Sequence, residues 1–231
     1  TLPELQRNYR GGEVLQSLVR RLTPTGVEGP FSGQASPVRA DWDLGGATLP
    51  PVFHEAVLGP DLGLSGPNTN EVEADVLGRW LRERQDDLQQ ADEVGDDLLK
   101  MVVVLTPYAE QVPVIRRALV LHGVESVWVG TEAPAGSAGY PLVLVSTVLQ
   151  SKDLAGAWGL GDLGRMTAFW LDAVSLSTRS LGIFGDPRVL RRWTGSEGAL
   201  VGALDRVHGW RRGVLEPRGS DRSLVGQVFR F

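Results

Sequence analysis

Two short apolar runs constrain the fold of this chain more than any other feature. Residues 101–105 read Met-Val-Val-Val-Leu and stop at a Thr-Pro pair, and residues 181–184 read Leu-Gly-Ile-Phe and stop at a Gly-Asp pair. An apolar run of this length that stops abruptly at turn residues is typical of a parallel strand buried on both faces. The two runs therefore predict an α/β protein whose strands end at a ligand-facing edge.

Helical and strand patterns alternate along the rest of the chain. Apolar spacing predicts helices at about 12–22, 70–84, 109–122, 163–177, 188–193 and 197–208, and further strands at 51–57, 124–129 and 141–148. Asn70 is suited to cap the second of these helices, and Gly123 to end the third. Strands joined through helices form parallel units with right-handed crossovers, so the order predicts a three-layer α/β sandwich.

We expect residues 1–231 to form a single domain with irregular segments. Residues 23–51 are rich in Pro, Gly and Ser and predict a long surface excursion, and residues 86–97 predict an acidic link. Residues 130–139 are small and flexible in character. We expect residues 209–231 to form a C-terminal extension. This extension contains the local basic clusters, and we interpret it as a solvated tail.

Composition excludes several classes of site. The 231 residues contain no cysteine, which rules out disulfides, thiolate zinc sites and cysteine nucleophiles, and the three histidines show no ligand spacing, so we predict no metal site. A net charge of −5 gives no overall basic field. Without a run long enough to span a membrane or an opening signal segment, we expect a soluble intracellular protein, cytoplasmic or nuclear, with no membrane partner.

Four segments follow one another in an order that resembles a known family. They are residues 5–10 (Leu-Gln-Arg-Asn-Tyr-Arg), 70–74 (Asn-Glu-Val-Glu-Ala), 105–111 (Leu-Thr-Pro-Tyr-Ala-Glu-Gln) and 181–187 (Leu-Gly-Ile-Phe-Gly-Asp-Pro). Together they are similar to the second RecA-like domain of the superfamily 1 helicases, in the group that contains the nonsense-mediated-decay RNA helicase. The resemblance covers most of the chain, and residues 105–111 carry its most specific part.

The resemblance implies a mainly parallel RecA-like sheet, which is a P-loop NTPase fold without its own P-loop. It implies that Arg10 faces the nucleotide phosphates. A surface arginine beside a capping turn would give the same sequence pattern. It gives residues 70–74 an architectural role, which capping also explains. It assigns contacts with single-stranded RNA or DNA to residues of two segments, namely Thr106, Pro107, Tyr108, Gln111, Gly130 and Thr131.

Departures from the family pattern bear on activity. The Gln-Gly-x-Glu element that the family carries before the strand at 141–148 is missing, and Leu176 occupies the place of the arginine that stabilises charge on the γ-phosphate. Such an arginine is worth roughly 10³ to 10⁵ in rate, so we expect weak or absent ATPase activity unless a helical shift brings Arg179 into that place. We therefore assign no catalytic residue.

The sequence also lacks the Gly-x-x-x-x-Gly-Lys-Ser/Thr loop that cradles phosphates. ATP and Mg²⁺ are accordingly expected only if this domain pairs with an N-terminal RecA-like domain, in cis or in trans.

Two other interpretations stay open. The chain could be a non-catalytic scaffold that keeps the fold as a surface for protein partners, for which Trp42 and Trp158 in loop-like stretches are the better candidates. Alternatively, it could be an unrelated α/β enzyme with a site near Asp172, Ser175 and Ser177.

Overall fold

The computed structural model describes the chain in seven segments. They comprise residues 42–44, 48–57, 68–91, 98–137, 139–148, 162–186 and 210–215, with the backbone alone for 162–168 and 210–215. No helix within these segments is long and apolar enough to cross a membrane.

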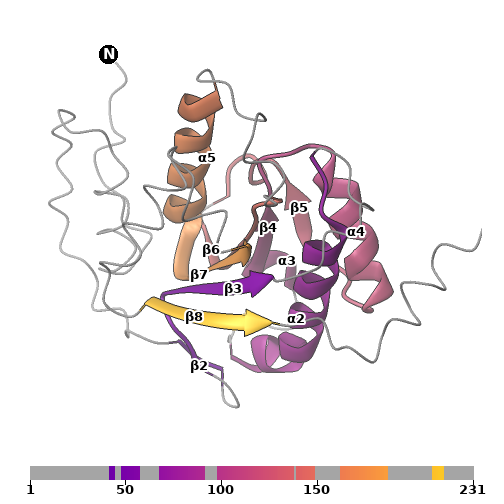
Figure 1. Ribbon diagram of the computed structural model, residues 1–231. Helices are drawn as coiled ribbons and strands as arrows, with labels where there is room; N and C mark the ends of the chain where they lie inside the picture. Colours follow the sequence, from indigo (N-terminus) through magenta and orange to yellow (C-terminus); the bar gives the residue numbers. More distant parts are fainter. Residues whose placement is uncertain are drawn as a thin grey trace, which may run out of the picture.

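A six-stranded sheet forms the centre of the protein (Figure 1). Its strands lie in the order β5-β4-β6-β7-β3-β8, and every neighbouring pair is parallel. The strands are β3 (Val52–Val57), β4 (Val102–Leu105), β5 (Trp128–Gly130), β6 (Tyr140–Ser146), β7 (Ser177–Gly185) and β8 (Trp210–Leu215). A separate antiparallel pair consists of β1 (Trp42–Asp43) and β2 (Thr48–Leu49).

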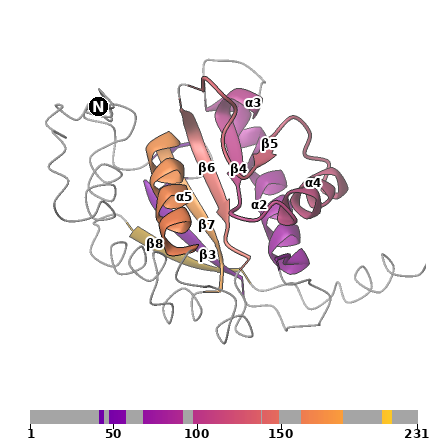
Figure 2. The ribbon, with the colours of Figure 1, turned by 90° about the horizontal axis from the view of Figure 1, so that it is seen from above.

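Helices cover both faces of this sheet. Helices α2 (Glu71–Gln90) and α4 (Gln111–Leu121) lie on one face, and α5 (Asp162–Leu176) lies on the other, as the view in Figure 2 shows. The short helix α3 (Leu98–Met101) leads directly into β4. The predicted three-layer α/β sandwich with a parallel RecA-like sheet is therefore confirmed.

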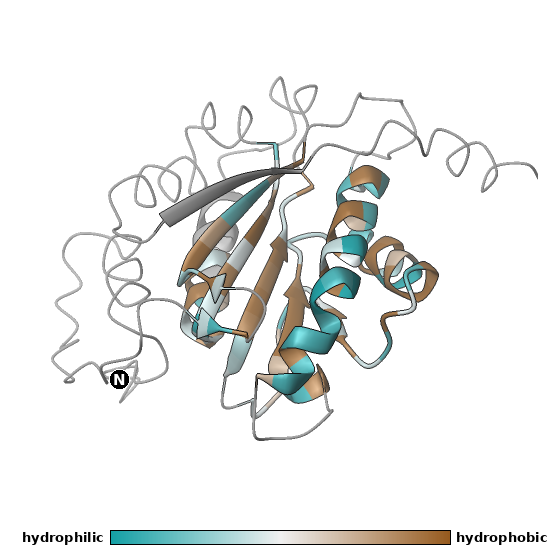
Figure 3. Ribbon diagram, turned by 90° about the horizontal axis from the view of Figure 1, so that it is seen from below, coloured by the Kyte–Doolittle hydropathy of each residue, from teal (hydrophilic) through white to brown (hydrophobic). Residues whose placement is uncertain are grey.

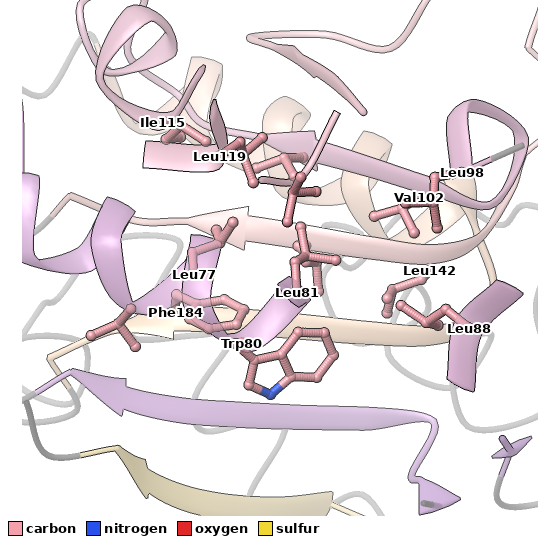
Figure 4. Packing of buried hydrophobic residues seen from close by; sticks show 14 of the residues in the cluster. Leu77, Trp80, Leu81, Leu88, Leu98, Val102, Ile115, Leu119, Leu142 and Phe184 are labelled. Atoms are coloured by element: carbon pink, nitrogen blue, oxygen red, sulfur yellow. The ribbon is translucent and has the colours of Figure 1, made fainter. Parts of the chain in front are cut away.

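The main core lies between α2, α4 and the sheet. Figure 3 shows hydrophobic residues concentrated on the central strands, while α2 carries hydrophilic as well as hydrophobic residues. In Figure 4 the side chains of Leu77, Trp80 and Leu81 pack together with residues of the strands, and all three are buried. The ring of Trp80 stacks on Phe53 at a centroid distance of 5.2 Å and meets the edge of Phe184 at 5.8 Å. These contacts fix α2 across β3 and β7.

Most of the predicted elements in the described segments are confirmed. The strands at 51–57, 101–105, 141–148 and 181–184 and the helices at 70–84, 109–122 and 163–177 all appear, with small shifts at their ends. Asn70 caps α2, since its side chain accepts a hydrogen bond from the Glu73 N–H, and Gly123 follows α4 with a φ of 68°. Helix α5 passes straight into β7, with no residue between Leu176 and Ser177.

Three predictions of local structure were wrong. The strand expected at 124–129 shrinks to Trp128–Gly130, because Ser126 has a φ of 61° and a left-handed residue cannot continue a strand. Helix α2 extends into the expected acidic link as far as Gln90, because Leu88 is fully buried against the core. Residues 210–215 form β8 beside β3, where a solvated tail was expected.

Several predictions fall outside the described segments. These are the helices at 12–22, 188–193 and 197–208, the nucleotide-facing Arg10, the exposed Trp158, and most of the excursion at 23–51. The last residues of that excursion contribute β1 and β2.

Candidate functional site at the carboxyl edge of the sheet

The strand register brings the predicted segments to a single edge. Leu105 of β4 lies beside Gly130 of β5 and Val145 of β6, and Val145 lies beside Ile183 of β7. The residues that follow these positions, including Pro107 and Asp186, therefore project from the same carboxyl edge. Parallel α/β sheets bind their ligands at this edge.

A hydrogen-bonded turn leads from β4 to α4. The Thr106 N–H donates to the Gly130 carbonyl at 3.1 Å, which ties the turn to the end of β5. The Thr106 hydroxyl in turn accepts from the Tyr108 N–H at 3.4 Å. Thr106 and Pro107 are buried, whereas Tyr108 is half-exposed. The hydroxyl of Thr106 thus shapes the turn, and Tyr108 is the side chain of the three that a ligand can reach.

Gly130 and Thr131 stand next to this turn and are both half-exposed. Their position beside Thr106 brings the two predicted nucleic-acid segments together. The structure thereby gathers Tyr108, Gly130 and Thr131 into one accessible group.

Gln111 has a different position from the one expected for a ligand contact. It is fully buried, and its side-chain amide binds both backbone groups of Asn70: Oε1 accepts from the Asn70 N–H at 2.8 Å, and Nε2 donates to the Asn70 carbonyl at 3.0 Å. Nε2 also lies 3.3 Å from Oγ of Ser146. The amide of Gln111 therefore links the starts of α2 and α4 to the end of β6.

Glu73 completes this buried network. The helicase resemblance gave its segment, residues 70–74, only an architectural role. Instead of reaching back to the helix cap as in a capping box, its Oε1 accepts from the Ser146 hydroxyl at 2.6 Å and from the Val148 N–H at 3.0 Å. Its other oxygen, Oε2, is buried with no hydrogen-bond partner among the described residues. The sequence feature that could have indicated this position is the spacing of Asn70 and Glu73, which puts the carboxylate in the first turn of a helix that starts at the edge of the sheet.

Burial dominates the electrostatics of Glu73. The carboxyl is completely buried, and this raises its pKa from the ordinary 4.5 to about 7. The hydrogen bonds from Ser146 and from the backbone oppose the rise, and the nearby charge of Asp186 adds to it. The carboxyl edge therefore contains a buried acid that changes charge near neutral pH.

The backbone around this acid is tightly constrained. Val148, which donates its N–H to Glu73, has a φ of 65°, a conformation that costs a β-branched residue roughly 1–3 kcal/mol. At Gly185 a Cβ atom would lie only 2.1 Å from Oγ1 of Thr147. The Gly185 carbonyl also lies 3.1 Å from Nε2 of His54. The close approach of Thr147 thus accounts for the glycine of the Gly-Asp pair that ends the predicted strand at 181–184.

Arg179 lies far from the accessible residues Tyr108, Gly130 and Thr131 at the carboxyl edge. It is exposed on β7, five positions before Phe184, which places it about 16 Å along the strand from the carboxyl edge. Its guanidinium lies 5.6 Å from the ring centroid of Trp42. Trp42 itself is only 6% exposed and pairs with Leu49 of β2, so the prediction that it marks a partner surface was wrong.

The alternative site near Asp172 shows little sign of nucleophile activation. The Ser175 hydroxyl donates to the Asp172 carbonyl of the same helix at 3.0 Å, and the Ser177 hydroxyl is buried with no partner in the described segments. Partial burial and then the charge of Glu132 raise the pKa of Asp172. The described histidine that is buried, His54, contacts Gly185 instead.

Within the described segments, no group of three or more His, Cys, Asp or Glu side chains is arranged to hold a metal ion. No protein-family model matches the chain, and no curated protein matches it at a significant level.

Proposed function

We propose that this chain is the second RecA-like domain of a superfamily 1 helicase-like protein, that it binds single-stranded RNA or DNA at the carboxyl edge of its sheet, and that it closes on a first RecA-like domain in cis or in trans. The observation that carries the proposal is the hydrogen bond from the Thr106 N–H to the Gly130 carbonyl, at 3.1 Å. It joins the two segments to which the helicase resemblance assigns nucleic-acid contacts.

The accessible groups at this edge suit a single strand. Tyr108 offers an aromatic ring on which a base can stack, and Gly130 and Thr131 offer backbone groups with little side-chain bulk beside them. The buried network built on Gln111 and Glu73 fixes the start of α4, next to Tyr108, against the start of α2 and the end of β6. A preformed surface of this kind lowers the entropy lost on binding.

In this proposal the domain is catalytically degenerate. Leu176 ends α5 where the resemblance expects an arginine, and Arg179 lies at the far end of β7 against Trp42. ATP and Mg²⁺ would be held mainly by the first motor domain, with Arg10 facing the nucleotide across the cleft. The protein would act inside the cell, in the cytoplasm or the nucleus.

A second function, a pseudo-helicase scaffold for protein assembly, is favoured by one observation. Gln111, expected to face the strand, has its amide occupied by Asn70 and Ser146. The same edge would then serve only to hold the fold together.

Binding of fluorescent single-stranded oligonucleotides of about 15 nucleotides to the complete chain, followed by anisotropy, separates these two functions. We expect binding that weakens about 5-fold or more in Y108A, since a stacked base contributes roughly 1–3 kcal/mol. The matched control is L121A, whose exposed side chain lies at the other end of α4. Absence of binding to both RNA and DNA at low salt would reject the helicase-like function and favour the scaffold.

A further inference from the structure

One tryptophan of the central sheet is exposed to solvent. Of the four tryptophans whose side chains the structure describes, three are buried: Trp42, Trp80 and Trp170. Trp128, on β5, keeps 38% of its surface exposed. A large apolar ring left in water on an otherwise well-packed sheet is a candidate contact for a ligand.

The indole ring of Trp128 is held in place from two sides. Its Nε1–H donates to the Glu132 carbonyl at 3.1 Å, beyond the end of β5. A Cβ atom at Gly130 would lie 2.9 Å from the same nitrogen, so the ring lies against the bare backbone of that glycine. The ring therefore leans along β5 toward the carboxyl edge, where Gly130 accepts the hydrogen bond from Thr106.

A guanidinium stands beside the same strand. Nη2 of Arg116, an exposed residue of α4, donates to the Val129 carbonyl at 2.9 Å. Because β5 pairs only with β4 in the described sheet, this contact also covers a carbonyl that another strand could otherwise use. The outer strand β5 thus carries an oriented aromatic ring at Trp128 and a guanidinium bound at the carbonyl of the next residue, Val129.

We propose that Trp128 and Arg116 form a nucleotide contact at the β5 edge, in which a base stacks on the indole of Trp128 and the adjoining phosphate meets the guanidinium of Arg116. The inference rests on the proposed function, because the ring lies next to Gly130, within the surface assigned to the single strand. An aromatic ring accepts any base, and a guanidinium forms forked bonds with phosphate. The contact is therefore tolerant of base sequence.

The neighbouring acids define how the contact works. Glu132 lies in the loop, two residues after the end of β5. Partial burial raises the pKa of Asp172, and the nearby charge of Glu132 adds to the rise, so two carboxylates lie near this edge. Carboxylates repel a run of phosphates, so binding at this edge depends on the base more than on the backbone charge. Loss of the ring should accordingly matter more than loss of the cation.

The test compares oligothymidine and oligouridine of about 15 nucleotides with the same strands carrying abasic residues, bound to the complete chain. We expect W128A to weaken binding of the base-containing strands by about 5- to 150-fold, and to leave binding of the abasic strands unchanged. W128F keeps a ring and should retain most of the affinity, whereas R116Q should weaken both kinds of strand. L121A is the control for removal of an exposed apolar side chain.

Three results would overturn the inference. If the wild-type protein binds single strands and W128A binds them equally well, the contact is absent and the proposed function stands. If W128A weakens the abasic strands as much as the others, the ring supports the fold and does not stack. If the wild-type protein binds neither RNA nor DNA, the inference and the proposed function fail together.

Discussion

Replacing Glu73 with glutamine should change how the stability of the protein depends on pH. The substitution keeps an oxygen that can accept from the Ser146 hydroxyl and the Val148 N–H, and it removes the ionisable group. The pKa of Glu73 rises from 4.5 to about 7 on folding, chiefly through burial. A shift of one pKa unit corresponds to about 1.4 kcal/mol, so this pKa shift changes the free energy of unfolding by about 3 kcal/mol.

The sign of the effect follows from the direction of the pKa shift. Because the folded protein holds the Glu73 proton more tightly than the unfolded chain does, the contribution to stability is fully present below the unfolded pKa of 4.5. It is lost as the pH rises through the folded pKa of about 7, and it stays constant above that. The free energy of unfolding of the wild type should therefore fall by about 3 kcal/mol relative to that of E73Q between about pH 4.5 and pH 8.

Urea unfolding of both proteins across this pH range measures the difference. The pKa values of Glu55 and Asp172 are also raised, but both groups are present in the two proteins and cancel in the subtraction. An unpaired amide N–H in E73Q would lower its stability equally at every pH. Parallel pH profiles for the two proteins would show that Glu73 titrates normally and would refute the reasoning.

Three further changes test other parts of the structure. G185A places a methyl group against the Thr147 hydroxyl and should lower the free energy of unfolding by about 1–3 kcal/mol, measured by thermal melting. The double variant T147A/G185A should recover part of this loss. Equal melting temperatures for G185A and the wild type would contradict the close contact. Q111A leaves the backbone of Asn70 without its partner and should lower stability by about 1–3 kcal/mol in urea. The control Q90A, which removes an exposed glutamine at the end of α2, should change stability by less than about 0.5 kcal/mol. S126G places a glycine at an exposed position with a left-handed φ, which glycine adopts without strain, and should raise the free energy of unfolding by up to about 1 kcal/mol and the melting temperature slightly. A lower melting temperature would show that the serine makes a contact of its own.

The sheet could be predicted from the sequence because its signals are local. The apolar runs of β4, β6 and β7 are continuous, and Asn70 and Gly123 mark helix ends by their own chemistry. The carboxyl edge follows from parallel topology once the strands are known. These features need no knowledge of partners distant in sequence.

The interior of the site could not be predicted in the same way. Ser146 and Val148 reach Glu73 across 73 and 75 positions, and nothing in the Asn-x-x-Glu spacing distinguishes a buried carboxylate from a solvated one. The helicase resemblance assigned Gln111 to the nucleic-acid surface, but its amide binds the backbone of Asn70. The short length of β5 depends on the backbone conformation of Ser126, for which serine gives no sign.

The absence of any connecting residue between α5 and β7 limits how this domain can vary in length. Alternate side chains of a strand point to opposite faces, so one residue inserted after Leu176 would turn every side chain of β7 over and send Phe184, whose ring meets Trp80, to the opposite face of the sheet. A natural or engineered homologue can therefore gain or lose residues in surface loops, but the helix and the strand at this junction must keep their lengths together.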